Sequence, residues 1–447
     1  MELTRELEII ELIKKEVKPA LGCTEPIAVS LAVARSCEAL REIGVEVASV
    51  KVEVSANILK NGMGVGIPGT GMVGLHIASA LAVTCGRSLY GLEVLKDLTP
   101  QSIDDAKAIV DAGAVKVVLA DTPLKLYIKA TVYSGDRAHY AATEIANNHD
   151  SIISVVRDGV SLLDHSHINP LKCAGSACTA VGGEVAPVEK TTLQYKLSVK
   201  EILQFAQEAS FENIEFILDS VKLNKALAEA GLREDFGLKV GKTILAREHS
   251  SVFGSSIMTY AMAATAAASD ARMAGCTLPA MSNSGSGNQG ITVTMPVIAV
   301  AEKMGVSQEQ LARALVLSHL VAIHIKGYLG KLSALCGCVI ASTGSSCGIV
   351  YLNGGSYEQV CAAIKNMVGN ITGMVCDGAK VGCALKVASG VSSSIQAAVL
   401  ALDNICISSN DGIIEDCIEK TICNLGRIGA EGMQTTDKMI LDIMVCK

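Results

Sequence analysis

Strand and helix patterns mix in the first part of the chain. Four segments show the polar–apolar alternation or the β-branched runs that are typical of strands: 47–54, 114–120, 125–133 and 151–156. Apolar residues at helical spacing lie between them, at 72–85 and 102–112. Strands and helices in this order predict an α+β domain over residues 46–190.

The rest of the chain follows the helical period almost throughout. Glycine-rich breaks divide six helix candidates: 211–230, 250–274, 308–326, 357–367, 384–402 and 413–428. Because no strand pattern lies among them, residues 191–447 are predicted to form a large all-α domain. Residues 1–45 are predicted to form two helices, broken at 19–26. The predicted fold class is therefore α+β, with an N-terminal α+β domain and a helical C-terminal domain.

Composition favours a protein with large packed cores. Half of the 447 residues are apolar, 19% are charged and the net charge is −7. Because basic runs are missing, a nucleic-acid partner is not expected. Segments 250–269 and 273–301 lack charged side chains, but their small residues and prolines favour buried helices over membrane spans. Residues 1–18 are amphipathic and lack the apolar stretch of a signal peptide, which predicts a cytoplasmic protein.

Two segments match the dinucleotide-binding pattern GxGxxG. Residues 64–69 follow a predicted strand and precede a predicted helix, although Pro68 interrupts the turn. An NAD-binding site at 64–69 is therefore an open alternative at this point. The second match, at 285–290, has no strand before it.

The segment 284–290 (SGSGNQG) suggests anion binding instead. Its small residues, Gly285 among them, let successive backbone N–H groups converge on one point. The side chains of Ser284, Ser286 and Asn288 add donors that suit a substrate carboxylate. A tight polar loop between buried helices is the alternative interpretation.

Cys23 stands out among the sixteen cysteines. In a cytoplasmic chain these are expected to be thiols, most of them packed as small apolar residues. Cys23 lies just before Pro26, where a helix is predicted to begin. The helix dipole favours a thiolate there, which makes Cys23 a candidate base or nucleophile. A buried structural cysteine is the alternative.

A second group of cysteines lies late in the chain, at Cys336, Cys338, Cys376 and Cys383. Residues seven apart on a straight helix are separated by about 10.5 Å, too far for one compact cluster. Two glycines between Cys376 and Cys383 permit a bend. Three thiolates without an obvious fourth ligand would leave one iron of a [4Fe–4S] cluster open to substrate. Zinc is the rival metal, although the CxxC pairs of zinc modules are missing, and buried free thiols are the default.

Histidines suggest two further metal-binding possibilities. His165 and His167 are two residues apart, and His319 and His324 are close on one predicted helix. Both pairs are more typical of surface or core histidines with ordinary hydrogen-bond partners.

Five motifs follow one another along the chain: GCTEPIAV at 22–29, NGMGVGIPGTG at 61–71, SGSGNQGI at 284–291, GKLSALCGC at 330–338 and CDGAKVGCALK at 376–386. They resemble the L-cysteine desulfidase family, which is similar to the α-chain of the oxygen-labile iron–sulfur L-serine dehydratases. The tail at 424–441 fits as well, so the likeness spans nearly the whole chain.

The resemblance implies roles for the cysteines. Cys336, Cys376 and Cys383 would hold a [4Fe–4S] cluster, and Cys23 would be the catalytic base. Cys338 is the alternative to Cys336 as a ligand.

The resemblance also implies how the rest of the site is built. The 284–290 loop would hold the substrate, and the 64–69 segment would be a structural turn. Because Cys23 can act only beside the cluster, residues 1–45 are expected to pack on the helical catalytic domain.

The implied activity is that of an L-cysteine desulfidase, which eliminates sulfide from L-cysteine to give pyruvate and ammonia. An iron–sulfur L-serine dehydratase is the nearest alternative, and a non-enzymatic iron–sulfur redox sensor is a more remote one. Sulfur is a soft ligand that suits iron–sulfur iron, which favours cysteine over serine. The expected partner is a small amino-acid substrate, with no nucleic acid or membrane and with a homo-oligomer left open.

Overall fold

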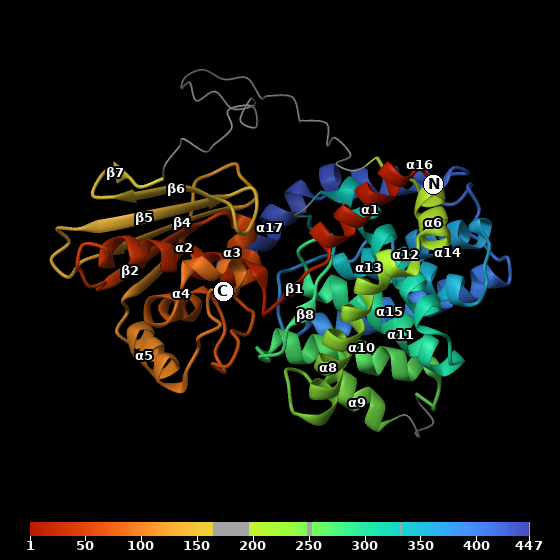
Figure 1. Ribbon diagram of the computed structural model, residues 1–447, viewed down its shortest axis with the longest axis horizontal. Helices are drawn as coiled ribbons and strands as arrows, with labels where there is room; N and C mark the ends of the chain where they lie inside the picture. Colours follow the sequence, from red (N-terminus) through yellow and green to blue (C-terminus); the bar gives the residue numbers. More distant parts are fainter. Residues whose placement is uncertain (164–195, 248–252, 331–332, 447) are drawn as a thin grey trace, which may run out of the picture.

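Two units with separate hydrophobic cores lie side by side in the computed structural model (Figure 1). The structure describes residues 1–163, 196–247, 253–330 and 333–446. The first unit contains a sheet and the second is helical, which confirms the predicted fold class. The predicted domain boundary at residue 190 lies outside the described residues.

A six-stranded sheet forms the first unit, in the order β3-β2-β4-β5-β6-β7. Its strands are β2 (Ser49–Val54), β3 (Val115–Leu119), β4 (Tyr127–Tyr133), β5 (Tyr140–Ala146), β6 (Ile152–Arg157) and β7 (Val160–Ser161). The β2–β3 pair is parallel and the other pairs are antiparallel. Buried and half-buried side chains alternate along β2, because one face of the sheet packs on helices and the other stays partly exposed.

The helices of the first unit are α2 (Thr24–Arg41), α3 (Ala56–Gly62), α4 (Leu75–Thr84), η1 (Ser88–Glu93) and α5 (Pro100–Asp111). Helix α2 covers the sheet, and its Ser36 hydroxyl donates to the carbonyl of Ala130 in β4 at 3.0 Å. This corrects the expectation for residues 1–45. Only α1 (Leu3–Glu16) packs on the helical core, whereas the apolar surface of α2 belongs to the core of the sheet unit.

The second unit is a bundle whose central helices are buried on almost every side. Its elements are α6 (Val199–Glu208), α7 (Phe211–Ile214), η4 (Glu215–Leu218), α8 (Asp219–Arg233), α9 (Val240–Ala246), α10 (Ile257–Met273), α11 (Gly287–Met304), α12 (Gln308–Leu329), α13 (Gly337–Leu352), α14 (Tyr357–Asn370), α15 (Cys383–Leu402), α16 (Ile418–Arg427), η5 (Ile428–Gly432) and α17 (Gln434–Val445). Helices α10, α11 and α13 are the central ones. The predicted helix at 211–230 is divided into α7, η4 and α8.

A short antiparallel pairing connects the two units. Strand β1 (Pro19–Ala20), which joins α1 to α2, pairs with β8 (Ala280–Met281) of the helical half. The prediction that the helical half contains no strand was therefore wrong for β8. The Ser282 N–H extends the pairing with a 2.8 Å bond to the carbonyl of Lys18. The pairing sets the start of α2 beside the start of α11.

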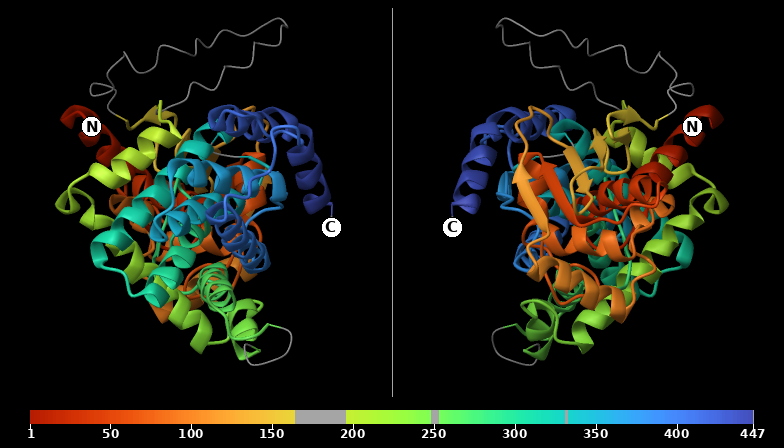
Figure 2. Two further views of the ribbon diagram at one scale, coloured as in Figure 1. Left: turned by 90° about the vertical axis from the view of Figure 1, so that its right-hand side faces the viewer. Right: turned by 90° about the vertical axis from the view of Figure 1, so that its left-hand side faces the viewer.

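The last helix returns to the first unit. In Figure 1, α17 (dark blue) lies between the sheet unit and the bundle, and the side views of Figure 2 show it at one edge of the molecule. Asp437 of α17 forms an ion pair with Lys60 of α3, whose side chain is almost fully buried. This ion pair is a second link between the two units.

Helix α15 has the length and the apolar composition that a membrane span requires. It is the one helix among the described residues that meets both conditions, and half of its apolar stretch is buried inside the protein. The core helix of a globular protein has the same properties. The charge-poor segments at 250–269 and 273–301 contribute to α10 and α11 in the middle of the bundle.

Candidate functional site

The thiols of Cys336 and Cys376 lie together because a short backbone contact joins their segments. The Cys336 N–H donates to the carbonyl of Met374, and the Cys376 N–H donates to the carbonyl of Ala334, each at 2.7 Å. Each thiol influences the pKa of the other. Motifs that are far apart in the sequence thus supply neighbouring sulfur atoms.

Cys383 joins this pair through a bend in the chain. It is the first residue of α15, and the segment between Cys376 and Cys383 is not helical. Gly378 has a left-handed φ of +93°, and a Cβ there would lie 2.2 Å from the carbonyl oxygen of Lys60. The bend expected from the glycines is therefore present. The Cys383 and Cys376 thiols are close enough to interact electrostatically.

Cys338 lies next to Cys336 but faces the interior of the bundle. It is 3% exposed, and its thiol donates to the carbonyl of Lys386 at 3.4 Å. Cys336, Cys376 and Cys383 are only half-buried. The Cys338 thiol is also close enough to be the largest influence on the pKa of Cys336. Its deeper burial and its bond to Lys386 favour Cys336 as the ligand.

An all-thiol donor set on three segments fits an iron–sulfur cluster. Among the described residues, no three His, Cys, Asp or Glu side chains approach closely enough to hold a single metal ion. The ligands of a cluster bind different irons and stand further apart than those of one ion. The interaction with Cys336, followed by burial, holds the pKa of Cys376 well above its usual range. Binding of a metal would therefore release protons from these thiols.

Cys23 lies within reach of this group. It is the N-cap of α2, which begins at Thr24, two residues before the predicted start. Its side chain packs with Val65 and Met273 in a small cluster that also contacts Cys383. Burial raises the pKa of the Cys23 thiol to about 12, although the nearby Arg272 lowers it. In the protein alone, burial thus opposes the thiolate that was expected at this helix N-terminus.

The 284–290 loop leads into α11 opposite Cys23. The Thr24 hydroxyl donates to the carbonyl of Gly285 at 3.2 Å. The hydroxyls expected to bind substrate have partners inside the loop: Ser284 Oγ donates to Asn283, and Ser286 Oγ accepts from the Gln289 N–H. Asn288 is half-buried and accepts a 3.3 Å bond from Arg272. The donors better placed for a ligand are therefore Asn288 and the backbone at the start of α11.

Three basic side chains near the cysteines were not predicted. Arg272 approaches Cys23 Sγ at 3.7 Å, and Lys60 Nζ donates to the carbonyl of Cys376 at 3.4 Å. Burial lowers the pKa of Lys326, which the nearby Cys376 and Cys336 raise. A sequence signal did exist for Arg272. In residues 250–301, Asp270 and Arg272 are the only charged side chains.

The 64–69 segment is a structural turn on the end of α10. It follows α3 and not a strand. The Gly66 N–H donates to the carbonyl of Met273 at 3.0 Å, and the Gly69 N–H donates to Gly275 at 3.1 Å. Two N–H groups that a phosphate would need are thus already bonded, which argues against the dinucleotide alternative.

The histidines do not join the cysteines in a common site among the residues described. His319 is fully buried and bonds Asn283 at 2.9 Å, and burial lowers its pKa to about 3. His324 pairs with Glu419 at 2.7 Å. His165 and His167 lie outside the described residues.

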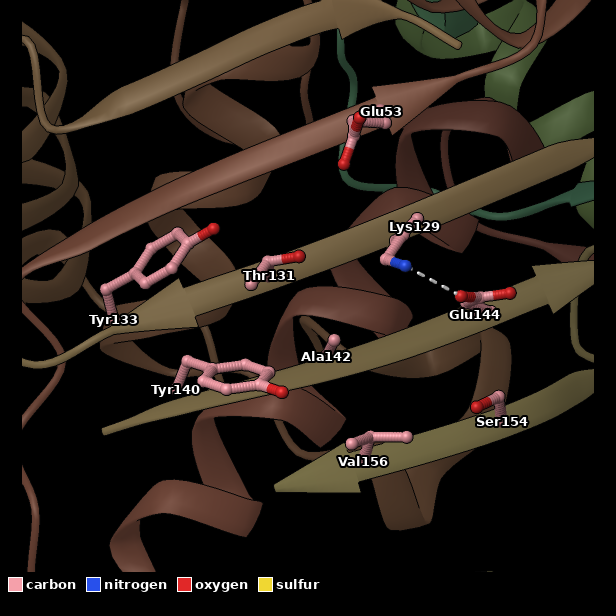
Figure 3. Close-up of a pocket in the computed structure, with 9 residues that line it drawn as sticks. All are labelled: Glu53, Lys129, Thr131, Tyr133, Tyr140, Ala142, Glu144, Ser154 and Val156. Atoms are coloured by element: carbon pink, nitrogen blue, oxygen red, sulfur yellow. Dashed lines mark ion pairs between the residues drawn. The ribbon is translucent and has the colours of Figure 1, made fainter. Parts of the chain in front are cut away.

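A hollow of about 360 Å³ lies elsewhere, on the partly exposed face of the sheet (Figure 3). Lys129 pairs with Glu144 across it at 3.0 Å, and the rings of Tyr133 and Tyr140 flank one end. No cysteine and none of the predicted site residues line it. The candidate chemistry is therefore at the junction of the two units.

Comparison with known proteins agrees with the geometry. The family model of the serine dehydratase alpha chain matches residues 89–442. The chain belongs to the serine dehydratase alpha chain family. It is also similar to proteins named UPF0597: 47% identical over 98% of both chains in Bacteroides fragilis (strain YCH46), 47% over 98% of this chain and 97% of the relative in Oleidesulfovibrio alaskensis, and 44% over both full lengths in Porphyromonas gingivalis.

Membership of the serine dehydratase alpha chain family makes the protein one of a group of lyases with which iron–sulfur centres are associated. The resemblance found in the motifs is confirmed at this level. The match includes Cys336, Cys376 and Cys383, and Cys23 precedes it. The similar UPF0597 proteins cover the region of Cys23 as well.

The turn at 64–69 provides a test of the site's architecture. A Cβ on Gly66 would lie 2.5 Å from backbone atoms of Ala274, whereas one on Gly64 would have 3.5 Å of space. We expect Gly66→Ala to destabilise the protein by about 1–3 kcal/mol through overpacking, and Gly64→Ala to have little effect. Chemical denaturation measures both. If Gly64→Ala were as harmful, or abolished NAD binding, the structural-turn interpretation would be wrong.

Proposed function

We propose that the protein is an L-cysteine desulfidase that converts L-cysteine and water to pyruvate, ammonia and hydrogen sulfide. The observation that carries the proposal is the grouping of Cys23, Cys336, Cys376 and Cys383 at the junction of the two units. Three of these thiols supply ligands for a [4Fe–4S] cluster, and the fourth lies beside them. Membership of a lyase family supports the same chemistry.

Each group then has one task. Cys336, Cys376 and Cys383 hold the cluster, which when bound supplies a Lewis acid for the leaving group. Cys23, as a thiolate, takes the Cα proton of the substrate. The C–H electron pair forms the Cα–Cβ double bond, and the Cβ–S pair leaves with the sulfur as sulfide. The aminoacrylate becomes an imine, which water hydrolyses to pyruvate and ammonia.

The 284–290 loop holds the substrate in this proposal. Asn288 and the first N–H groups of α11 face the α-carboxylate, and the helix dipole favours an anion there. Ser284 and Ser286 shape the loop through their internal hydrogen bonds. The compartment is the cytoplasm, where thiol ligands stay reduced.

L-Serine is the second candidate substrate, and the name of the matched family favours it. Elimination from serine follows the same steps with hydroxide as the leaving group. The softness of sulfur toward iron favours cysteine.

An anaerobic assay of reconstituted protein with L-cysteine and L-serine side by side tests the proposal. We expect pyruvate from both or from cysteine alone, with the larger kcat/KM for cysteine and sulfide released in equal amount. A larger kcat/KM for serine would make the protein a serine dehydratase. If neither amino acid gave pyruvate while the cluster was present, the lyase function would be wrong.

Single cysteine variants test the ligands. Cys336→Ala, Cys376→Ala and Cys383→Ala should each lose most of the bound iron, because a cluster with two thiolates is poorly held. Cys338→Ala is the matched control and should retain it. Iron and acid-labile sulfide are measured after anaerobic reconstitution. Loss of iron from the Cys338 variant alone would exchange the roles of Cys336 and Cys338.

The Cys23→Ser variant tests the base. It should keep its iron, because Cys23 is not a ligand in this proposal. Turnover should fall by about 10²–10⁴-fold, the usual cost of a lost general base, since a serine hydroxyl is too weakly acidic to ionise near neutral pH. Exchange of the substrate Cα proton with deuterium should fall equally. Near-normal turnover with a full cluster would remove Cys23 from the mechanism.

A further inference from the structure

Arg272 is a buried cation for which the structure provides no anion. It is 3% exposed, near the end of α10. Its guanidinium donates to the carbonyl of Gly22 at 2.7 Å and to Asn288 Oδ1 at 3.3 Å, and it lies 3.7 Å from Cys23 Sγ. Its Nε is buried without a hydrogen-bond partner. Among the described residues, no carboxylate lies within ion-pair distance of it. A buried charge left this way is costly unless a ligand completes it.

The surroundings of the guanidinium add further positive partial charge, which strengthens the preference for an anion at this point. It lies against the backbone of Gly287, where a Cβ would be only 2.2 Å from Arg272 Nε. Gly287 is the first residue of α11, an 18-residue helix, and the N-cap of α2 is Cys23. Two helix N-termini, each with a partial positive charge, thus converge on one buried cation. The carboxylate in the first turn of α2, Glu25, bonds Asn61 and Thr24 and not Arg272. The guanidinium and the start of α11 therefore favour a further anion between them.

We propose that Arg272 is the substrate-positioning residue that receives the α-carboxylate of the amino acid, together with Asn288 and the first turn of α11. This inference rests on the proposed lyase function and deepens it. The guanidinium presents a planar fork that suits a carboxylate. Because the same guanidinium touches Cys23, a carboxylate bound there places the adjoining Cα–H beside the Cys23 sulfur.

The position of Arg272 also predicts specificity. The α-carboxylate becomes the group by which the site recognises its ligands, because the guanidinium, Asn288 and the helix end all serve that one group. Amino acids that differ in the β-substituent should bind alike, and analogues without the carboxylate should bind poorly.

Equilibrium binding to the anaerobic holoenzyme tests this with two unreactive probes, L-alanine and L-alaninamide. Calorimetry should show wild type preferring L-alanine. Arg272→Met should weaken L-alanine binding by about 10- to 100-fold, which is the range for a lost charge-assisted contact. The affinity for L-alaninamide should stay almost unchanged. Arg313→Met is the matched control, because Arg313 also bonds backbone carbonyls, those of Ala206 and Gln207. It should leave the ratio of the two affinities intact.

The ratio of the L-alanine and L-alaninamide affinities distinguishes a substrate-positioning role of Arg272 from a purely structural one. A structural defect would weaken both probes equally, and that result, or wild type that binds both equally or binds no L-alanine, would overturn the inference. Thermal melting and cluster absorbance verify that each variant is folded. If Arg272→Met does not fold, Arg272→Lys keeps the charge without the planar fork, and the same ratio should fall by a smaller factor. An unchanged ratio in a folded Arg272→Lys protein would also count against the inference.

Kinetic measurements distinguish a failure of the Arg272 inference from a failure of the proposed lyase function. L-Alanine binding that depends on Arg272, in a protein that eliminates neither L-cysteine nor L-serine, overturns the lyase proposal and leaves Arg272 as a carboxylate site. Active enzyme in which Arg272→Met leaves KM for L-cysteine unchanged overturns the Arg272 inference alone.

Discussion

The β1–β8 pairing determines where everything else in the site can be. It joins two residues on each side, and the bond from Ser282 to Lys18 extends it. Together with the Lys60–Asp437 ion pair and the bonds of the 64–69 turn to the end of α10, it fixes the relative position of the sheet unit and the helical unit. With it, the chain enters α2 next to the point where it enters α11. The N-cap Cys23 and the 284–290 loop are neighbours for this reason, although they are about 260 residues apart.

Local patterns predicted the parts of the fold in which one face is buried and the other is exposed. The alternation in β2 and β4 is a case, since these strands have a helix-covered face and a partly exposed face. The same reasoning missed β5 (YAATEIA), which is buried at most positions and therefore does not alternate. For α11 it gave only the expectation of buried helices within 273–301, and it missed α13, because small and apolar residues surround both helices on all sides and no 3.6-residue stripe appears.

Site residues could be predicted only where the residue type and its spacing in the sequence indicate the chemistry. Cys376 and Cys383, with glycines between them, indicated a bend that brings two thiols together, and the bend is there. The partners of Ser284 and Ser286 were beyond prediction, because a hydroxyl in a loop bonds whatever the folded loop presents. Arg272 was marked in the sequence as one of two charged side chains in 250–301, but its contacts with Gly22 and Asn288 depend on tertiary structure.

The charges at the junction of the two units favour the binding of an anion beside Cys23. Arg272 and two helix N-termini bring positive charge to a region where burial keeps the Cys23 thiol protonated. The nearest carboxylate of α2, Glu25, is already bonded to Asn61 at 3.1 Å and to Thr24 at 3.2 Å. Glu25 therefore offsets the first turn of α2 and, among the described residues, forms no ion pair with Arg272. A substrate carboxylate beside Arg272 is the anion that would complete this site.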